Sequence, residues 1–121
     1  MCSESLKIGI AQTDIIAENK PANLAVVASY AQEAAAKECD LVVFPEVITT
    51  GFTAFERVAE AAPYPSLQAI RNMAAHSGVA IASSLLLKSG NALYNRVFIA
   101  TAEGGLLTQD KRHLFRPGGE A

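Results

Sequence analysis

The sequence has few cysteines and no stretch apolar enough to suggest a membrane segment or an export signal. Cys2 and Cys39 are its only cysteines among 121 residues, which argues against a disulfide scaffold and fits a reducing compartment. No run approaches the roughly 20 apolar residues of a membrane span. The first residues lack a basic region followed by an apolar core, so they do not read as a secretory signal. We therefore predict a soluble cytoplasmic protein without membrane contact.

The sequence also lacks an excess of charge of either sign. Ten lysines and arginines stand against twelve aspartates and glutamates, and no basic cluster is larger than Lys111-Arg112. Binding to a phosphate backbone requires a basic face, so nucleic acid is not an expected partner. There is no glycine-rich phosphate loop, no His-Glu-x-x-His pair and no serine nucleophile elbow. Two histidines and two distant cysteines likewise argue against a zinc site.

What the sequence does have is enough apolar residues for one folded domain. Half of the residues are hydrophobic and 18% are charged, which excludes a disordered chain. A chain of this length buries roughly two-thirds of the surface that its unfolded form exposes.

The hydrophobic pattern alternates between strand-like runs and helical spacing. We expect the order β-α-β-loop-α-β-β-β, with strands at 6–12, 41–44, 79–87, 93–100 and 106–109. The first helix should start at Asn19, and Ser66 should cap the second, which should end at Gly78. One face of the first helix should be buried (Leu24, Val27, Ala28, Ala31, Ala34, Ala35) and the other should face water (Asn23, Ser29, Gln32, Glu33, Lys37).

These elements form a layered α/β arrangement, a mixed sheet with helices against it. No element remains to cover the last strands. A sheet with a bare face and a bare edge is liable to aggregate, so a partner or further sequence is implied.

Two charged residues follow strands and are candidates for catalysis. Glu46 comes directly after the apolar run that ends at Pro45, at the rim of the sheet, where a carboxylate can act as a general base. The alternative is a solvated loop glutamate. Lys111 follows the last strand, where it could stabilise an oxyanion, close the strand as a surface charge, or join Arg112 and His113 in gripping an anionic substrate.

The cysteines are weaker candidates. Cys39 lies at a predicted helix C-terminus, whose negative dipole end opposes formation of a thiolate. We therefore interpret it as a structural residue, and Cys2, near the N-terminus, as equally inert.

Several segments resemble the carbon–nitrogen hydrolase (nitrilase) superfamily. Asp-Leu-Val-Val-Phe-Pro-Glu (40–46), followed by Thr-Gly-Phe (50–52), resembles its first signature, and residues 7–12 resemble its opening strand. Tyr-Asn (94–95), Val-Phe-Ile (97–99) and Asp-Lys-Arg-His-Leu-Phe (110–115) are similar to its second signature. The segments occur in the family's order and spacing. The sequence of residues 111–120 is similar to that of the ω-amidase-like branch, whose members act on small amides of dicarboxylic acids.

The resemblance implies a fold, a chemistry and an assembly. The fold is an α-β-β-α sandwich, of which residues 1–121 would be the N-terminal part of a single domain. The activity is hydrolysis of a small amide by a glutamate, a lysine and a cysteine, without metal or organic cofactor, in subunits that pair into dimers or larger assemblies. Glu46 would be the general base and Lys111 would hold the oxyanion.

The family resemblance also suggests further site residues. Glu120 is near the position of a supporting glutamate, and Phe52 and His113 are candidates for the substrate pocket. The nucleophilic cysteine should lie a few dozen residues beyond Lys111, and neither cysteine of this sequence matches it. We therefore expect this chain alone to be inactive. The alternative is a truncated, inactive relative that binds a partner through its open sheet.

Overall fold

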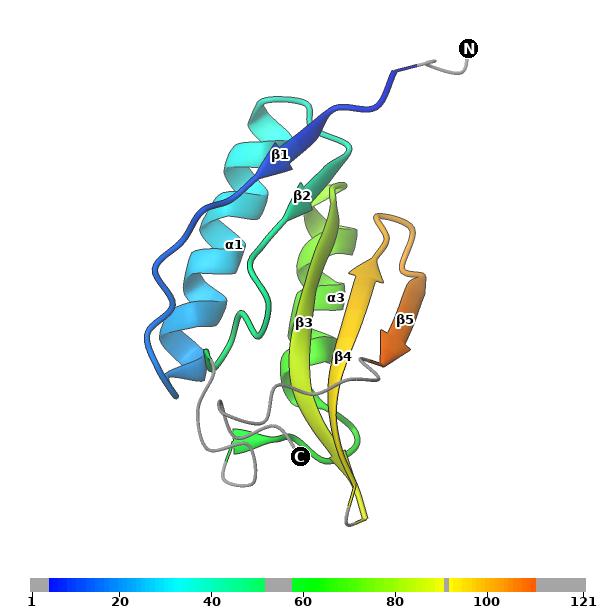
Figure 1. Ribbon diagram of the computed structural model, residues 1–121. Helices are drawn as coiled ribbons and strands as arrows, with labels where there is room; N and C mark the ends of the chain where they lie inside the picture. The colour runs from blue at the N-terminus through cyan, green and yellow to red at the C-terminus, as the bar shows by residue number, and fades with distance from the viewer. Residues whose placement is uncertain (1–4, 52–57, 91, 111–121) are drawn as a thin grey trace.

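Five strands form one mixed sheet in the order β1-β2-β3-β4-β5 (Figure 1). The computed structural model describes residues 5–51, 58–90 and 92–110. The elements are the strands β1 (Ile8–Ile10), β2 (Leu41–Val43), β3 (Ala80–Ser89), β4 (Ala92–Ala100) and β5 (Leu106–Asp110), and the helices α1 (Lys20–Ala36) and α3 (Pro65–Ser77). The expected order of elements is confirmed, with strand ends shifted by one or two residues.

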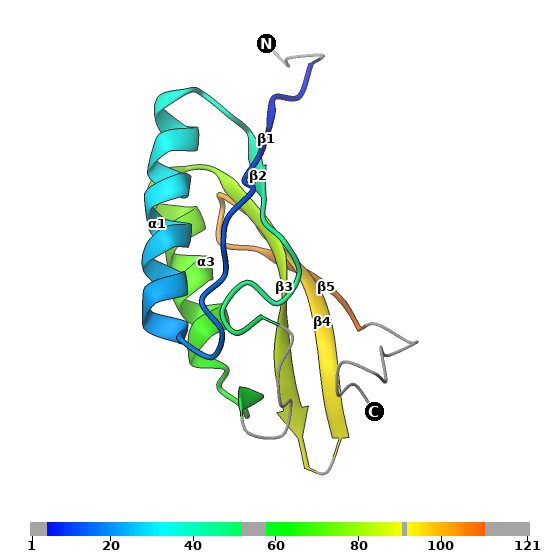
Figure 2. The ribbon, with the colours of Figure 1, turned by 60° about the vertical axis from the view of Figure 1, so that its left-hand side comes forward.

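The sheet has a parallel half and an antiparallel half. β1, β2 and β3 run parallel, and each is joined to the next by a connection that contains a helix. β3 and β4 form a long hairpin, and β5 pairs antiparallel with β4. Both helices lie on the same side of the sheet (Figure 2). This confirms the predicted α/β class, a mixed sheet with helices on one side.

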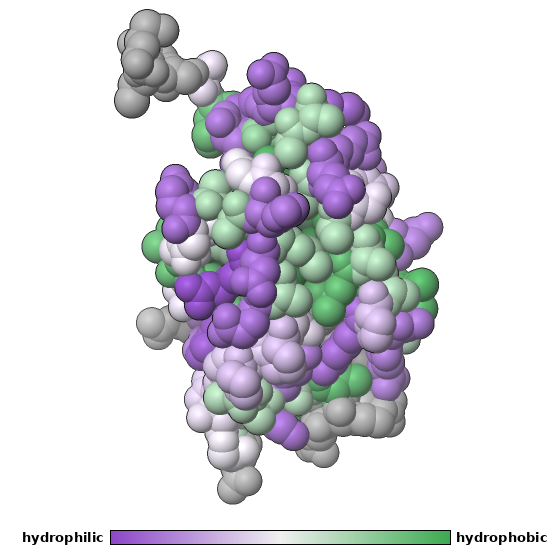
Figure 3. All heavy atoms as spheres, turned by 180° about the vertical axis from the view of Figure 1, so that it is seen from behind, coloured by the Kyte–Doolittle hydropathy of each residue, from purple (hydrophilic) through white to green (hydrophobic). Residues whose placement is uncertain are grey.

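The core lies between the two helices and the sheet. Val27 of α1, Ile70 of α3, Ile81 of β3 and Phe98 of β4 are at most 1% exposed and belong to one cluster. Burying a side chain of this size contributes about 1.5–3 kcal/mol. The buried alanines of α1, such as Ala31, have little side chain to hold the helices apart. The outer surface of the helix layer mixes hydrophilic and weakly apolar residues (Figure 3).

Two of the three predicted helix-end residues are confirmed. The side chain of Asn19 accepts a hydrogen bond from the backbone N–H of Ala22 at 3.2 Å, which satisfies one of the open donors at the start of α1. Gly78 ends α3 in the left-handed conformation, with φ of 74°, and its N–H donates to the carbonyl of Ala74.

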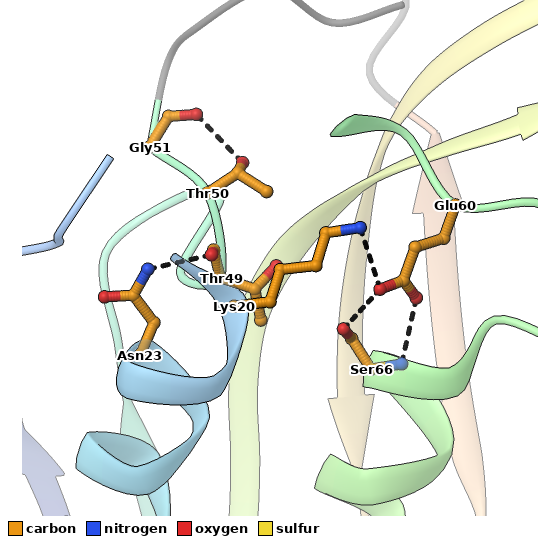
Figure 4. Close-up of polar contacts among 7 residues, drawn as sticks. All are labelled: Lys20, Asn23, Thr49, Thr50, Gly51, Glu60 and Ser66. Carbon is orange, nitrogen blue, oxygen red and sulfur yellow. Dashed lines mark hydrogen bonds and ion pairs between the residues drawn. The ribbon is translucent and has the colours of Figure 1, made fainter. Parts of the chain in front are cut away.

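The prediction that Ser66 caps the second helix is wrong. α3 already begins at Pro65, and the cap position is Tyr64, whose side chain makes no capping bond. The backbone N–H and hydroxyl of Ser66 instead both donate to the Glu60 carboxylate. Lys20, the first residue of α1, lies 3.1 Å from the same carboxylate (Figure 4). A carboxylate from outside α3 thus satisfies the open N–H of Ser66 and joins the starts of both helices.

Among the described residues, no helix or strand covers the sheet face away from α1 and α3, and this face carries exposed apolar side chains. Val42 and Phe98 point into the core, so their neighbours along each strand point to the other face. On that face Ile8, Ile10, Val97 and Leu107 are 49%, 76%, 44% and 62% exposed. The expected bare face is therefore present. None of the helices in the described ranges is long and apolar enough to span a membrane.

We expect the 121-residue chain, expressed alone, to self-associate through this face. Replacing Val97 and Leu107 together by lysine should lower the apparent mass in light scattering and the binding of a hydrophobic dye, because two charges interrupt the patch. Ser29→Lys with Gln32→Lys adds the same charge to exposed positions of α1 and is the control. Equal effects of both pairs, or no effect of the first, would contradict the assignment.

Candidate active site

Glu46 lies just beyond the C-terminal end of β2, in a turn that spans residues 46–50. Its residue surface is exposed, as expected for a loop glutamate. Its carboxylate nevertheless has a specific partner: Oε1 accepts a hydrogen bond from the Nδ2 of Asn95 at 3.2 Å. Asn95 belongs to β4 and is completely buried. The carboxylate is therefore open to solvent and also held by the sheet.

Two serines of β3 hold the backbone on either side of Glu46. The hydroxyl of Ser83 donates to the carbonyl of Pro45 at 2.6 Å. The hydroxyl of Ser84 accepts from the N–H of Val47 at 2.8 Å. Sequence reasoning did not assign these serines to the site. The available signal was a pair of polar residues in an otherwise apolar strand.

Val47, the residue after Glu46, adopts a backbone conformation that β-branched residues rarely take. Its φ is 48°. Such a conformation costs on the order of 1–3 kcal/mol and persists only where the surroundings enforce it. Here the carbonyl of Val47 accepts from the N–H groups of Thr50 and Gly51, and its side chain is buried in a small cluster with Leu86. Packing and hydrogen bonds together thus fix a strained turn next to Glu46.

Asn23 ties the same loop to α1, and its predicted exposure is wrong. It is 2% exposed, and its Nδ2 donates to the carbonyls of Ile16 and Thr49, both at 2.8 Å. Its Oδ1 accepts from the N–H of Ile16 at 2.9 Å. Figure 4 shows the amide directed at Thr49. A buried amide needs such partners, and these lie outside its own helix, where the periodicity of α1 gives no information.

The second candidate, Lys111, lies outside the described residues. The residue before it, Asp110, is described. Arg96 of β4 binds Asp110 of β5 through two hydrogen bonds, at 2.7 and 3.3 Å. These hydrogen bonds to the Asp110 carboxylate raise the pKa of the Arg96 guanidinium. Arg96 also lies 5.9 Å from the ring centroid of Tyr94. The end of β5 is therefore bound to β4 through Arg96, the residue that follows Asn95 in the sequence.

Other predicted site residues cannot be compared with the structure. Phe52, His113 and Glu120 lie outside the described residues, as does Cys2.

Cys39 is far from the candidate site. It precedes β2, whereas Glu46 follows it, so about 20 Å of extended chain separates the two. Its side chain packs against the core, and its sulfur lies on the side of the sheet that faces α1, near Gly9. This position agrees with a packing role. Across the part of the chain that the structure describes, no group of three or more histidine, cysteine, aspartate or glutamate residues could hold a metal ion.

Comparison with known proteins points to one family. A family model for carbon–nitrogen hydrolases matches residues 7–121. The chain is 34% identical over 82 residues to omega-amidase YafV of Yersinia enterocolitica, an alignment that covers 67% of this chain and 32% of that protein.

Solved structures agree with this match. The crystal structure of XC1258 from Xanthomonas campestris, a CN-hydrolase superfamily protein with an arsenic adduct in its active site, superimposes with a TM-score of 0.84 and 36% identity. That match covers 95% of this chain and 43% of that one. An amidase of the nitrilase superfamily from Nesterenkonia AN1 has the same TM-score at 21% identity, with 94% and 46% covered, and so supports the fold alone. The chain thus spans less than half the length of these relatives.

Replacing Asn23 by alanine should lower the free energy of unfolding by about 2–4 kcal/mol, because the carbonyls of Ile16 and Thr49 and the N–H of Ile16 lose their partner. Chemical denaturation of the full-length protein, followed by circular dichroism, measures this. Asn72→Ala, at an exposed position of α3, is the control and should change stability by less than about 0.5 kcal/mol. Similar losses in the two variants would show that the Asn23 network does not stabilise the loop.

Proposed function

The chain belongs to the carbon–nitrogen hydrolase family, and from this membership we propose that its protein hydrolyses the carbon–nitrogen bond of a small amide, with Glu46 as general base. The observation that carries the proposal is the carboxylate of Glu46, which follows β2 in a strained turn and accepts a hydrogen bond from buried Asn95. It occupies the position where the sequence resembles the family's first signature.

The proposed reaction proceeds through a thioester. Glu46 removes the proton of a cysteine thiol, and the thiolate attacks the amide carbonyl. Lys111 stabilises the oxyanion of the tetrahedral intermediate and helps Glu46 to pass the thiol proton to the departing ammonia; the carbon–nitrogen bond breaks, the thioester forms and Glu46 is again a carboxylate. Glu46 then takes a proton from water, whose oxygen attacks the thioester and releases the carboxylic acid and the thiol. The cysteine would come from sequence outside these 121 residues, because Cys39 lies at the wrong end of β2.

The arrangement of β4 supports a shared site for Glu46 and Lys111. Asn95 contacts the Glu46 carboxylate, and the next residue, Arg96, binds Asp110. Lys111 follows Asp110 directly in the sequence. The residue before Lys111 and the Glu46 carboxylate are therefore bound to adjacent residues of β4.

We further propose that residues 1–121 are the N-terminal part of one α-β-β-α domain. The uncovered apolar face of the sheet supports this, since a second layer would bury it, and the relatives are more than twice as long. An assembly of two or more subunits and a cytoplasmic location are part of the same proposal. They follow from the family resemblance and from the low cysteine content.

An inactive relative that binds a partner through the bare face is the alternative function. The exposed apolar residues on this face support partner binding as well as they support a missing second layer of the same domain. Reading the coding frame beyond residue 121 separates the two. An in-frame cysteine after a further apolar strand supports the hydrolase, whereas a stop codon favours the binding module.

In the full-length protein, Glu46→Gln should lower the rate of ammonia release from an amide by about 10²–10⁴-fold, because glutamine cannot accept a proton. The circular dichroism spectrum should not change, since the two side chains have the same shape. Glu103→Gln, in the exposed turn before β5, is the matched control and should keep full activity. Near-normal turnover in Glu46→Gln would reject the general-base role.

The substrate should be an ω-amide of a small dicarboxylic acid. The similarity to an omega-amidase and the basic run Lys111-Arg112 support a preference for a substrate with a free carboxylate. A charge-assisted hydrogen bond contributes about 1.5–3 kcal/mol, so kcat/KM should exceed that of a neutral amide of equal length by roughly 10- to 100-fold. Equal or faster turnover of the neutral amide would contradict this substrate class.

A further inference from the structure

Asn95 combines complete burial with a hydrogen bond to an exposed catalytic candidate. It is 0% exposed, and its Nδ2 reaches the Oε1 of Glu46 across 49 residues of sequence. Nothing in its own strand predicts this role, because a buried asparagine inside an apolar strand is unfavourable unless its amide has partners.

The surroundings of Asn95 restrict how its amide can move. Its register partner on β3 is Leu86, and Leu93 lies two residues earlier on the same face of β4. Leu86 belongs to the small apolar cluster that contains Val47, the residue after Glu46, and Leu93 packs against that cluster. A packed apolar environment limits side-chain rotation and strengthens a hydrogen bond made within it. Asn95 is therefore a rigid donor.

Glu46, by contrast, has few restraints on its side chain from the residues that the structure describes. It is exposed, and a glutamate side chain has three rotatable bonds that solvent leaves free. The serine contacts described above fix the backbone around Glu46 but do not touch its carboxylate. Of the side-chain hydrogen bonds given above for the described residues, the bond from Asn95 is the one that orients this carboxylate.

We propose that Asn95 is a positioning residue that holds the Glu46 carboxylate in the orientation required to accept a proton. This inference rests on the proposed function, because it assumes that Glu46 is the general base. The competing interpretation is purely structural: the bond only satisfies a buried amide, and the exposed carboxylate would work equally well in water.

The test measures kcat and KM separately in the full-length protein. Asn95→Ala should lower kcat by about 10- to 100-fold and leave KM within roughly threefold, because a misplaced base slows the proton transfer and not the binding. Phe98→Leu is the matched control. Phe98 is equally buried on the same strand but points into the opposite core, so its truncation should destabilise the protein and leave kcat within about twofold.

A double-mutant cycle separates positioning from structure. Glu46→Asp keeps a base but shortens the side chain by one methylene, so its carboxylate no longer reaches the amide. If Asn95 acts through Glu46, adding Asn95→Ala to Glu46→Asp should lower kcat by less than about threefold further. A structural role predicts the same proportional loss in both backgrounds. If Asn95→Ala does not fold, Asn95→Leu has a similar size, avoids a cavity and donates no hydrogen bond, and it should lower kcat to the same extent.

The outcomes distinguish the positioning role of Asn95 from the proposed hydrolase function on which it rests. An active wild type, an inactive Glu46→Gln and an unchanged kcat in the Asn95 variant would overturn the positioning role and leave the proposed function standing. Equal proportional losses in the two backgrounds of the cycle would do the same. A full-length wild type that hydrolyses no amide would overturn both.

Discussion

The candidate site depends on the hydrogen bonds that β3 makes to the backbone of the loop after β2. Ser83 and Ser84 lie in the middle of the sheet and bind the loop on both sides of Glu46. The strand before this loop, β2, is paired on both edges, so the point at which the loop leaves the sheet is fixed. These bonds, together with the packing of Val47 into a buried cluster, offset the strain of its left-handed conformation.

β4 connects this loop to the opposite edge of the sheet. Consecutive residues of a strand point to opposite faces, so Asn95 reaches Glu46 on the bare face while Arg96 reaches Asp110 on the helix-covered face. One short segment thus relates the end of β2 to the end of β5. Asn23 adds a third support from α1, where its amide holds the carbonyl of Thr49. The site is rigid because three separate elements determine one loop.

The two faces of the sheet serve different purposes. The helices cover one face with a close-packed core, and the other face leaves Ile10 and Leu107 open to solvent. That uncovered face also carries the contact between Glu46 and Asn95. A second layer over that face would remove water from the surroundings of the carboxylate and strengthen its interactions there.

Local sequence by itself determined the order of the elements, the class of the sheet, the cap at Asn19, the end of α3 at Gly78 and the candidacy of Glu46. Each depends on neighbours within a few residues or on a simple period. Only the tertiary structure decided that Ser66 binds Glu60, that Asn23 is buried against Thr49, and that Asn95 meets Glu46. These polar contacts join segments whose separation is set by strand register and loop path. Hydrophobic periodicity specifies which face is buried, but it carries no information on which distant carbonyl or carboxylate will meet a buried amide.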